Sequence, residues 1–108
     1  MANEPQARPN PYADIAPALG EITNKVLFGE VWERPGLSPR DRSLITVATL
    51  VATYRTNELP FHLERALENG VTRDEISELI THLAFYAGWP AANTAVLIAR
   101  DVFKKREK

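Results

Sequence analysis

Glu58 and His62, in the stretch TNELPFHLERALENG at residues 56–70, have the types and the spacing that acid–base chemistry needs. Residues four apart lie on one face of a helix, one turn above the other. A carboxylate beside an imidazole favours the imidazolium and raises its pKa from about 6.5, which places a proton donor near neutral pH. The same spacing is typical of an exposed ion pair worth a few tenths of a kcal/mol. On spacing alone, the surface pair is the favoured interpretation.

Glu30 is a second carboxylate with a chemical role to consider. It lies close to Trp32 in the stretch LFGEVWERPG, which we predict to be a loop. A carboxylate beside a partly buried tryptophan can have a raised pKa and serve as an acid. An ordinary surface turn residue is an equally good interpretation.

His82 and Trp89 belong to a third stretch, THLAFYAGWP. A lone histidine on the flank of an apolar helix stripe is more often a core or interface residue than a catalyst. Trp89 stands between a glycine and a proline, at the position predicted for a helix N-cap, where a short polar residue is usual. We expect its ring to pack or to line a pocket. The two histidines of the chain lie on different predicted helices without a matching third ligand, which predicts no metal site.

Helical periodicity and capping residues predict the elements that must position these side chains. Ser38 and Pro39 begin one helix, and Thr72 with Glu75 forms a capping box for another. Asp14 is the N-cap expected for the first helix. Nothing alternates with the period of two that a strand requires. We therefore expect an all-α fold, with residues 1–12 as a flexible lead and residues 13–108 as one small helical domain. Its five antiparallel helices are expected at about 14–28, 39–54, 57–70, 73–87 and from 90 onward.

The apolar residues of two expected helices follow different patterns. In the first helix they form one stripe at helical spacing. In the helix at 39–54 they cover more than one face, which predicts burial on most sides. So much burial in so short a chain suggests a partner subunit. The stripe of the first helix consists of Ile15, Leu19, Ile22 and Val26.

The composition excludes several classes of function. The net charge is −1, which argues against nucleic-acid binding. The chain has no cysteine, which removes disulfides, thiolate metal sites and thiol-based peroxide reduction. The longest nearly apolar run is about half of what a membrane span requires. We expect a soluble, cytoplasmic protein that binds neither nucleic acid nor membrane.

Four sequence patterns carry a resemblance to a known family. They are W-x-R-P-G-L, R-S-L-x-T, E-L-x-x-H-L-x-x-A-L-x-N-G-V-T and Y-A-G-x-P-A-A-N. Over residues 27–103 the chain resembles the carboxymuconolactone decarboxylase family of the alkyl hydroperoxidase-like superfamily. The resemblance implies an all-helical subunit in a symmetric homo-oligomer, a trimer or hexamer. It also implies decarboxylation of γ-carboxymuconolactone in the degradation of aromatic compounds, without metal or organic cofactor.

The absence of cysteine places the chain in a particular branch of that superfamily. The peroxidase members use a C-x-x-C just before a histidine. Alignment on His62 puts Arg55 and Glu58 where the two cysteines would be, and Ser43 in place of an upstream glutamate. With no thiol to oxidise, peroxidase activity is excluded. His62 is retained relative to the peroxidase pattern, and Glu58 replaces one of its cysteines. This combination matches the decarboxylase pattern and favours a functional Glu58–His62 pair.

The leading hypothesis is a cofactor-free lyase acting on a small, anionic, cyclic carboxylate. Loss of CO2 leaves a dienolate that must be stabilised and protonated. His62 would be the general acid and Glu58 would orient it. An isomerase or ring-rearranging enzyme of another pathway would use the same residues. The alternative without catalysis is an oligomeric binding protein. The supporting residues are expected to be Glu30 or His82 in a proton relay, Arg42 or Arg55 on the remaining carboxylate, and Trp32 and Trp89 as apolar walls.

Overall fold

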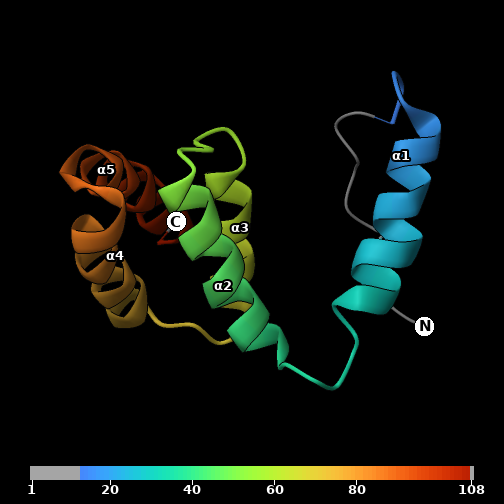
Figure 1. The fold of residues 1–108 in the computed structure, drawn as a ribbon, viewed down its shortest axis with the longest axis horizontal. Coiled ribbons are helices and arrows are strands. Elements are labelled where there is room, and N and C mark those ends of the chain that lie inside the picture. The colour runs from blue at the N-terminus through green and yellow to red at the C-terminus, as the bar shows by residue number, and fades with distance from the viewer. Residues whose placement is uncertain (1–12, 108) are drawn as a thin grey trace. The chain divides into compact units, whose positions relative to one another are not determined.

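The computed structural model describes residues 13–107, and all regular structure in this range is helical. This confirms the all-α class predicted from the sequence. The chain divides between Pro39 and Arg40 into two compact units. The helices are α1 (Pro17–Ile22), the π-helix η2 (Thr23–Val31), α2 (Pro39–Ala52), α3 (Leu59–Glu68), α4 (Arg73–Ala87) and α5 (Trp89–Arg106), as labelled in Figure 1. None of the helices between residues 13 and 107 has the combined length and apolarity that a bilayer crossing requires.

The first unit contains one continuous helical segment that changes from α to π geometry. Ala16 is the N-cap and Pro17 follows in the first turn, so the prediction of Asp14 as N-cap is wrong by two residues. Proline is tolerated there because the first N–H groups of a helix have no partner within the helix. The segment extends to Val31 rather than ending near residue 28. At the π turn, a Cβ on Gly29 would lie 3.1 Å from the Asn24 carbonyl oxygen, and glycine avoids that contact.

The apolar stripe predicted for this helix exists, but the first unit by itself does not bury it. Leu19 and Ile22 are each more than half exposed, and Ile15 is 84% exposed. Of the described residues 13–39, Gly20 and Trp32 are the two that are buried. Within its own unit, the helix therefore leaves an apolar face exposed.

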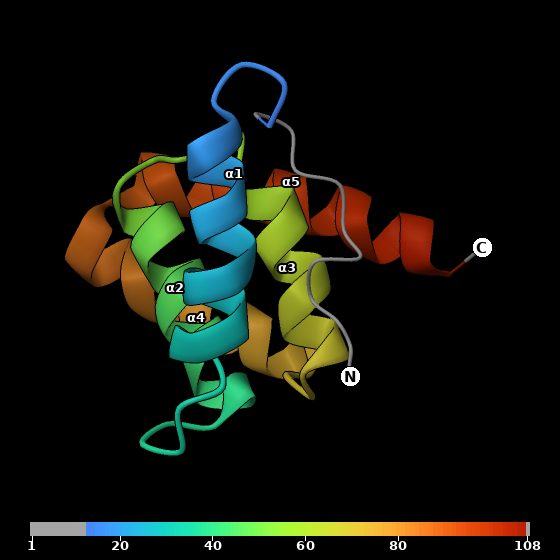
Figure 2. The ribbon, with the colours of Figure 1, turned by 90° about the vertical axis from the view of Figure 1, so that its right-hand side faces the viewer.

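The second unit, from Arg40 onward, holds the core. Helix α5 packs against both α3 and α4 (Figure 2). Its buried face is rich in alanine, and such small side chains let the helix axes approach closely. The core consists of Val47, Val51, Leu59, Leu63, Ala66, Val71, Ile76, Ile80, Ala84, Ala92, Ala95, Ala99 and Val102.

Local capping residues determine most helix boundaries in this unit. Pro39 begins α2, as predicted. The capping box of α4 is present: the Glu75 N–H donates to Thr72 Oγ1 at 3.0 Å, and the Thr72 N–H donates to Glu75 Oε1 at 2.9 Å. Gly88, at φ 103°, both ends α4 and serves as N-cap of α5. Trp89 is therefore the first helical residue, and its assignment as N-cap is wrong by one position.

Helix α2 is less covered than its composition predicts. Ser43, Val47 and Val51 form its buried face, whereas Ile45 is 52% exposed. Burial on most sides of α2 does not occur within the second unit.

Candidate functional site

Glu58 and His62 lie one turn apart at the beginning of α3, as their spacing predicts. Glu58 is the N-cap residue and its carbonyl oxygen accepts a hydrogen bond from the His62 N–H at 3.3 Å. The Glu58 side chain is exposed, and within residues 13–107 it forms no side-chain hydrogen bond or ion pair. The two residues therefore share a helix face without an ion pair joining their side chains.

The imidazole of His62 is held more firmly than the Glu58 carboxylate. His62 is half-buried, and its Nδ1 atom has almost no contact with solvent. The ring of Phe61 meets it edge-on, with centroids 4.9 Å apart and planes at 89°. These contacts restrict the rotation of the imidazole, as a positioned proton donor requires.

Two arginines, one on α2 and one on α3, have partly buried guanidinium groups. Arg65 is three residues after His62 and so shares its face of α3. Arg42 is on α2, next to the fully buried Ser43. Both guanidinium groups have an Nε atom removed from solvent, although each side chain remains half-buried overall. A half-buried guanidinium is suited to hold a carboxylate through two parallel hydrogen bonds.

A part-buried hydrogen bond links α2 to α3. The amide Nδ2 of Asn69 donates to the Ser43 hydroxyl oxygen at 3.0 Å. Asn69 is seven residues after His62, and therefore on the same helix face. The bond joins the beginning of α2 to the end of α3, so the helices run antiparallel at this contact. Sequence reasoning missed this pairing, because 26 residues separate the partners and no local pattern connects them.

Arg55 lies outside this cluster, in the turn between α2 and α3. It is exposed, and its N–H donates to the Leu50 carbonyl oxygen at 2.8 Å to close α2. The preceding Tyr54 has φ 60°, a left-handed conformation that is strained for a bulky residue. Its hydroxyl is hydrogen-bonded to Thr94 Oγ1 of α5 at 3.2 Å, which helps to hold the turn in place.

His82 and Trp89 lie at an exposed aromatic corner where α4 meets α5. His82 stacks on Tyr86 with centroids 4.7 Å apart, and Trp89 meets Phe85 edge-on at 5.1 Å. All four side chains are exposed. Within residues 13–107, the ring of His82 stacks on Tyr86 and forms no hydrogen bond or ion pair. The structure therefore shows no hydrogen bond between His82 and His62.

Glu30 and Trp32 belong to the first unit. Glu30 lies in the last turn of η2 and is exposed, so its predicted loop position is wrong. Trp32 is the C-cap residue of η2 and is buried, with its ring centroid 5.8 Å from that of Phe28. Over residues 13–107, no group of three or more histidine, cysteine, aspartate or glutamate side chains could hold a metal ion.

Comparison with known proteins gives this polar face a chemical context. The chain is 51% identical over 81 residues to a 4-carboxymuconolactone decarboxylase of Acinetobacter baylyi, a match covering 75% of this chain and 60% of that protein. It is 36% identical over 80 residues to a nitrosuccinic acid decarboxylase of Metarhizium robertsii, covering 74% of this chain and 56% of the relative. An uncharacterised 15.0 kDa protein of Paracoccus denitrificans is 27% identical over 96 residues, covering 87% and 72%.

The chain thus spans about 60% of the length of the first of these relatives. A model of the carboxymuconolactone decarboxylase family matches residues 17–101, which include both compact units in large part. That range contains all eight residues singled out from the sequence. The chain belongs to the carboxymuconolactone decarboxylase family.

Proposed function

We propose that this protein is a carboxy-lyase that removes CO2, without a cofactor, from a small anionic cyclic acid such as 4-carboxymuconolactone. The observation that carries the proposal is the 51% identity to a decarboxylase of that name over 75% of the chain. The α3 face supports it, because the oriented imidazole of His62 and the half-buried guanidinium of Arg65 lie on the same side of this helix.

The proton-transfer step is assigned to His62. Departure of CO2 from a carbon conjugated to a carbonyl group leaves its electron pair on the substrate as a dienolate. A positioned acid must then protonate carbon to complete the reaction. Nδ1 is removed from solvent, so the proton is delivered from Nε2. Glu58, one turn earlier, stabilises the imidazolium once the substrate excludes water from the exposed start of α3.

The carboxylate that stays on the substrate needs a cation. Arg42 fits this role better than Arg55, because Arg42 is half-buried beside Ser43 whereas Arg55 is an exposed turn residue. Arg65 shares the His62 face and is the second candidate. A guanidinium there also draws the anionic substrate to the site from solution.

The protein is further proposed to act as a symmetric homo-oligomer, a trimer or hexamer. Exposed apolar side chains support this, because monomers rarely present such large patches to water. They include Leu19 and Ile22 of the first unit, Ile45 of α2 and the aromatic corner. Glu30, Trp32, His82 and Trp89 would contribute a relay and apolar walls where copies meet.

The nitrosuccinic acid decarboxylase supports a second candidate substrate class. Its name describes an open-chain acid with a nitro group. A nitro group, like a conjugated carbonyl, accepts the electron pair left by departing CO2. The same proton donor would therefore serve an acyclic acid whose carboxyl group lies next to such an electron-withdrawing group.

The direct test is incubation of the purified protein with 4-carboxymuconolactone and, separately, with nitrosuccinate, following CO2 by mass spectrometry. The parent is expected to turn over the lactone, and His62→Gln is expected to lose about 10²-fold or more in kcat. Asp101→Asn, an exposed change on α5, is the control. Turnover of nitrosuccinate alone would replace the cyclic substrate by the acyclic one. Equal rates for parent and His62→Gln would contradict the mechanism, and no turnover of either acid would favour a binding protein.

A further inference from the structure

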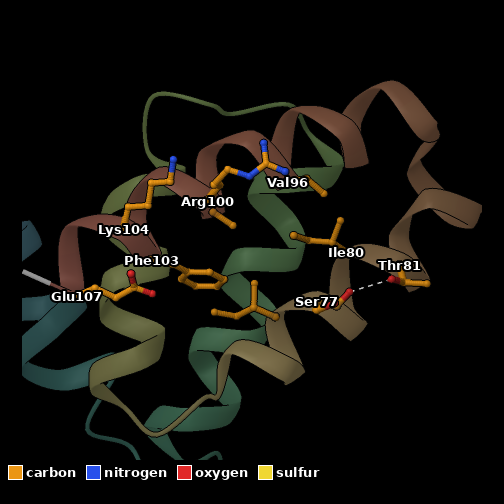
Figure 3. Close-up of a pocket in the computed structure, with 10 residues that line it drawn as sticks. Ser77, Ile80, Thr81, Val96, Arg100, Phe103, Lys104 and Glu107 are labelled. Carbon is orange, nitrogen blue, oxygen red and sulfur yellow. Dashed lines mark hydrogen bonds between the residues drawn. The ribbon is translucent and has the colours of Figure 1, made fainter.

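The second unit carries a groove between α4 and α5 that the proposed reaction does not use. It has a volume of about 430 Å³ and lies between the first half of α4 and the second half of α5 (Figure 3). Small-molecule sites in proteins have volumes of this order. The described residues that line it all belong to the second unit, and none of them is on α2 or α3. Its floor is apolar and consists of Ile76, Ile80, Val96, Ala99 and Phe103.

Arg73 holds one end of the groove in a fixed arrangement. Its guanidinium lies over the Phe103 ring, 4.9 Å from the ring centroid, and donates to the Phe103 carbonyl oxygen at 3.4 Å. The same guanidinium is paired with the Glu107 carboxylate at 2.9 Å. The end of the groove is therefore preformed, and the carboxylate in its lining is already neutralised within the protein.

The α5 rim of the groove carries two cations, Arg100 and Lys104 (Figure 3). Within residues 13–107 neither of them forms an ion pair. They are four residues apart, and like charges at that spacing destabilise a helix. Lys104 lies in the last turn of α5, where the helix dipole favours a cation, but Arg100 lies before that turn. A bound anion would remove the repulsion between the two side chains.

The opposite rim, on α4, offers an acceptor instead. The Thr81 hydroxyl donates to the Ser77 carbonyl oxygen at 2.9 Å, so its hydrogen is not available to an anion. The two rims therefore differ in chemistry. A ligand with an apolar body and one negative edge is held with that edge toward α5.

We propose that this groove binds a small apolar carboxylate, with the apolar body on the floor and the carboxylate on Arg100 and Lys104. A guanidinium can donate to both oxygens of a carboxylate at once. Val96 is 40% exposed, so the floor is open to the ligand from solution. The site is independent of the proposed decarboxylation, because its lining includes neither His62 nor Arg65.

Titration of the intact protein with 2-naphthoate tests the proposal. A rigid ring system is the better probe, because it loses little conformational freedom on binding and can contact an aromatic side chain such as Phe103. Isothermal titration calorimetry is expected to show saturable binding with a dissociation constant below about 1 mM. 2-Naphthamide has the ring without the charge, and acetate has the charge without the ring. Each is expected to bind at least about tenfold more weakly.

Two pairs of matched variants locate the bound carboxylate. Arg100→Gln is expected to raise the dissociation constant of 2-naphthoate about tenfold, whereas Lys105→Gln, on the same helix outside the lining, should leave it unchanged. Val96→Asp is expected to raise it about tenfold or more, because a second carboxylate would then face the ligand. Leu97→Asp makes the same change of charge one residue later, outside the lining, and should bind like the parent. All four side chains are exposed, so these variants are expected to keep the fold, which circular dichroism checks.

Several outcomes would overturn the proposal. Absence of saturable binding would remove the site, and equal affinity for 2-naphthoate and 2-naphthamide would remove the charge contact. Equal effects of Val96→Asp and Leu97→Asp would show that net charge alone matters. Loss of affinity in Arg65→Ala but not in Arg100→Gln would place the carboxylate on the α3 face, and would leave the proposed function standing without this second site.

Discussion

At the scale of single residues, the proposed site depends on the difference between a restrained imidazole and an exposed carboxylate. His62 is half-buried with Phe61 edge-on to its ring, whereas the Glu58 side chain extends into solvent. An exposed ion pair contributes little to stability, because water screens both charges. In the proposed mechanism, Glu58 therefore has its largest effect when a bound substrate excludes water.

Arg65 provides a residue-scale prediction about substrate binding. Arg65→Ala is expected to raise KM about tenfold or more with a smaller change in kcat, because a charge-assisted hydrogen bond to the carboxylate is lost. Arg65→Lys should restore only part of the affinity, since an ammonium lacks the planar fork of a guanidinium. Steady-state kinetics with the accepted acid measure both values.

The control for Arg65 is Arg73→Ala. Arg73 is an exposed arginine, and it is paired with Glu107, which is 34 residues later in the chain. The KM of this variant is expected to equal that of the parent. An equal rise in KM for both alanine variants would indicate a general effect of net charge, and would contradict a specific role for Arg65.

At the scale of elements, a part-buried hydrogen bond links α2 to α3. Ser43 is fully buried, and its hydroxyl oxygen accepts the Asn69 amide. Buried polar groups are costly unless they are hydrogen-bonded, so this contact also disfavours other alignments of the two helices. The candidate residues on both helices depend on that alignment.

Ser43→Ala is expected to lower the free energy of unfolding by about 1–3 kcal/mol, because the Asn69 amide loses its buried acceptor. Urea unfolding followed by circular dichroism measures the change. Thr49→Ala is the matched control, since the Thr49 hydroxyl is exposed and donates within its own helix to the Ile45 carbonyl oxygen. That variant should change stability by no more than about 0.5 kcal/mol. Similar losses in both variants would show that the Ser43–Asn69 bond has no special role.

The capping box of α4 gives an element-scale prediction about pH. The Thr72 N–H and then the Arg40 guanidinium lower the pKa of the Glu75 carboxyl below its ordinary value of 4.5. The ionised form is thus favoured in the folded state. The stability that Glu75 contributes is fully present above pH 4.5 and is lost as pH falls through the lowered folded pKa.

Glu75→Gln should therefore show a smaller loss of stability than the parent when the pH falls from about 5 to about 3. Glutamine can still accept the Thr72 N–H through its amide oxygen, so the capping geometry is kept. Urea titrations at several pH values measure the slope. Glu78→Gln, which changes a glutamate of α4 outside the capping box, serves as control. Parallel curves for the parent and Glu75→Gln would contradict the assignment.

At the scale of the whole molecule, the exposed apolar surface is the dominant feature. Each compact unit presents part of it: the stripe on the first helix in one unit, and Ile45 with the aromatic corner in the other. A chain of 108 residues has a modest core and cannot bury all of its apolar side chains. Association of several copies would remove this apolar surface from water, which is favourable.

Multi-angle light scattering should give three or six times the chain mass of 12.1 kDa. Replacing Leu19 and Ile22 by aspartate is expected to shift the distribution toward smaller species, because two charges would have to enter an apolar contact. Far-ultraviolet circular dichroism reports whether the helices persist in this variant. An oligomer of unchanged mass would show that the stripe is not at an interface.

Several features of the fold and the site follow from the sequence. Pro39 and the Thr72–Glu75 box act within one turn of helix, so their positions predicted the beginnings of α2 and α4. The spacing of Glu58 and His62 predicted a shared face for the same reason. The errors also arise locally: Gly88 takes the N-cap position that was predicted for Trp89, because its positive φ lets one residue connect two helices.

The sequence by itself determined the all-α class, the main helix boundaries and the family, because these depend on periodicity, caps and motifs carried by neighbouring residues. The tertiary structure alone decided which side chains are covered and which distant ones meet. It paired Ser43 with Asn69 and left Glu58 and His82 exposed. Burial and long-range contact depend on how helices pack, and a stripe of given periodicity can face a core or a partner equally well.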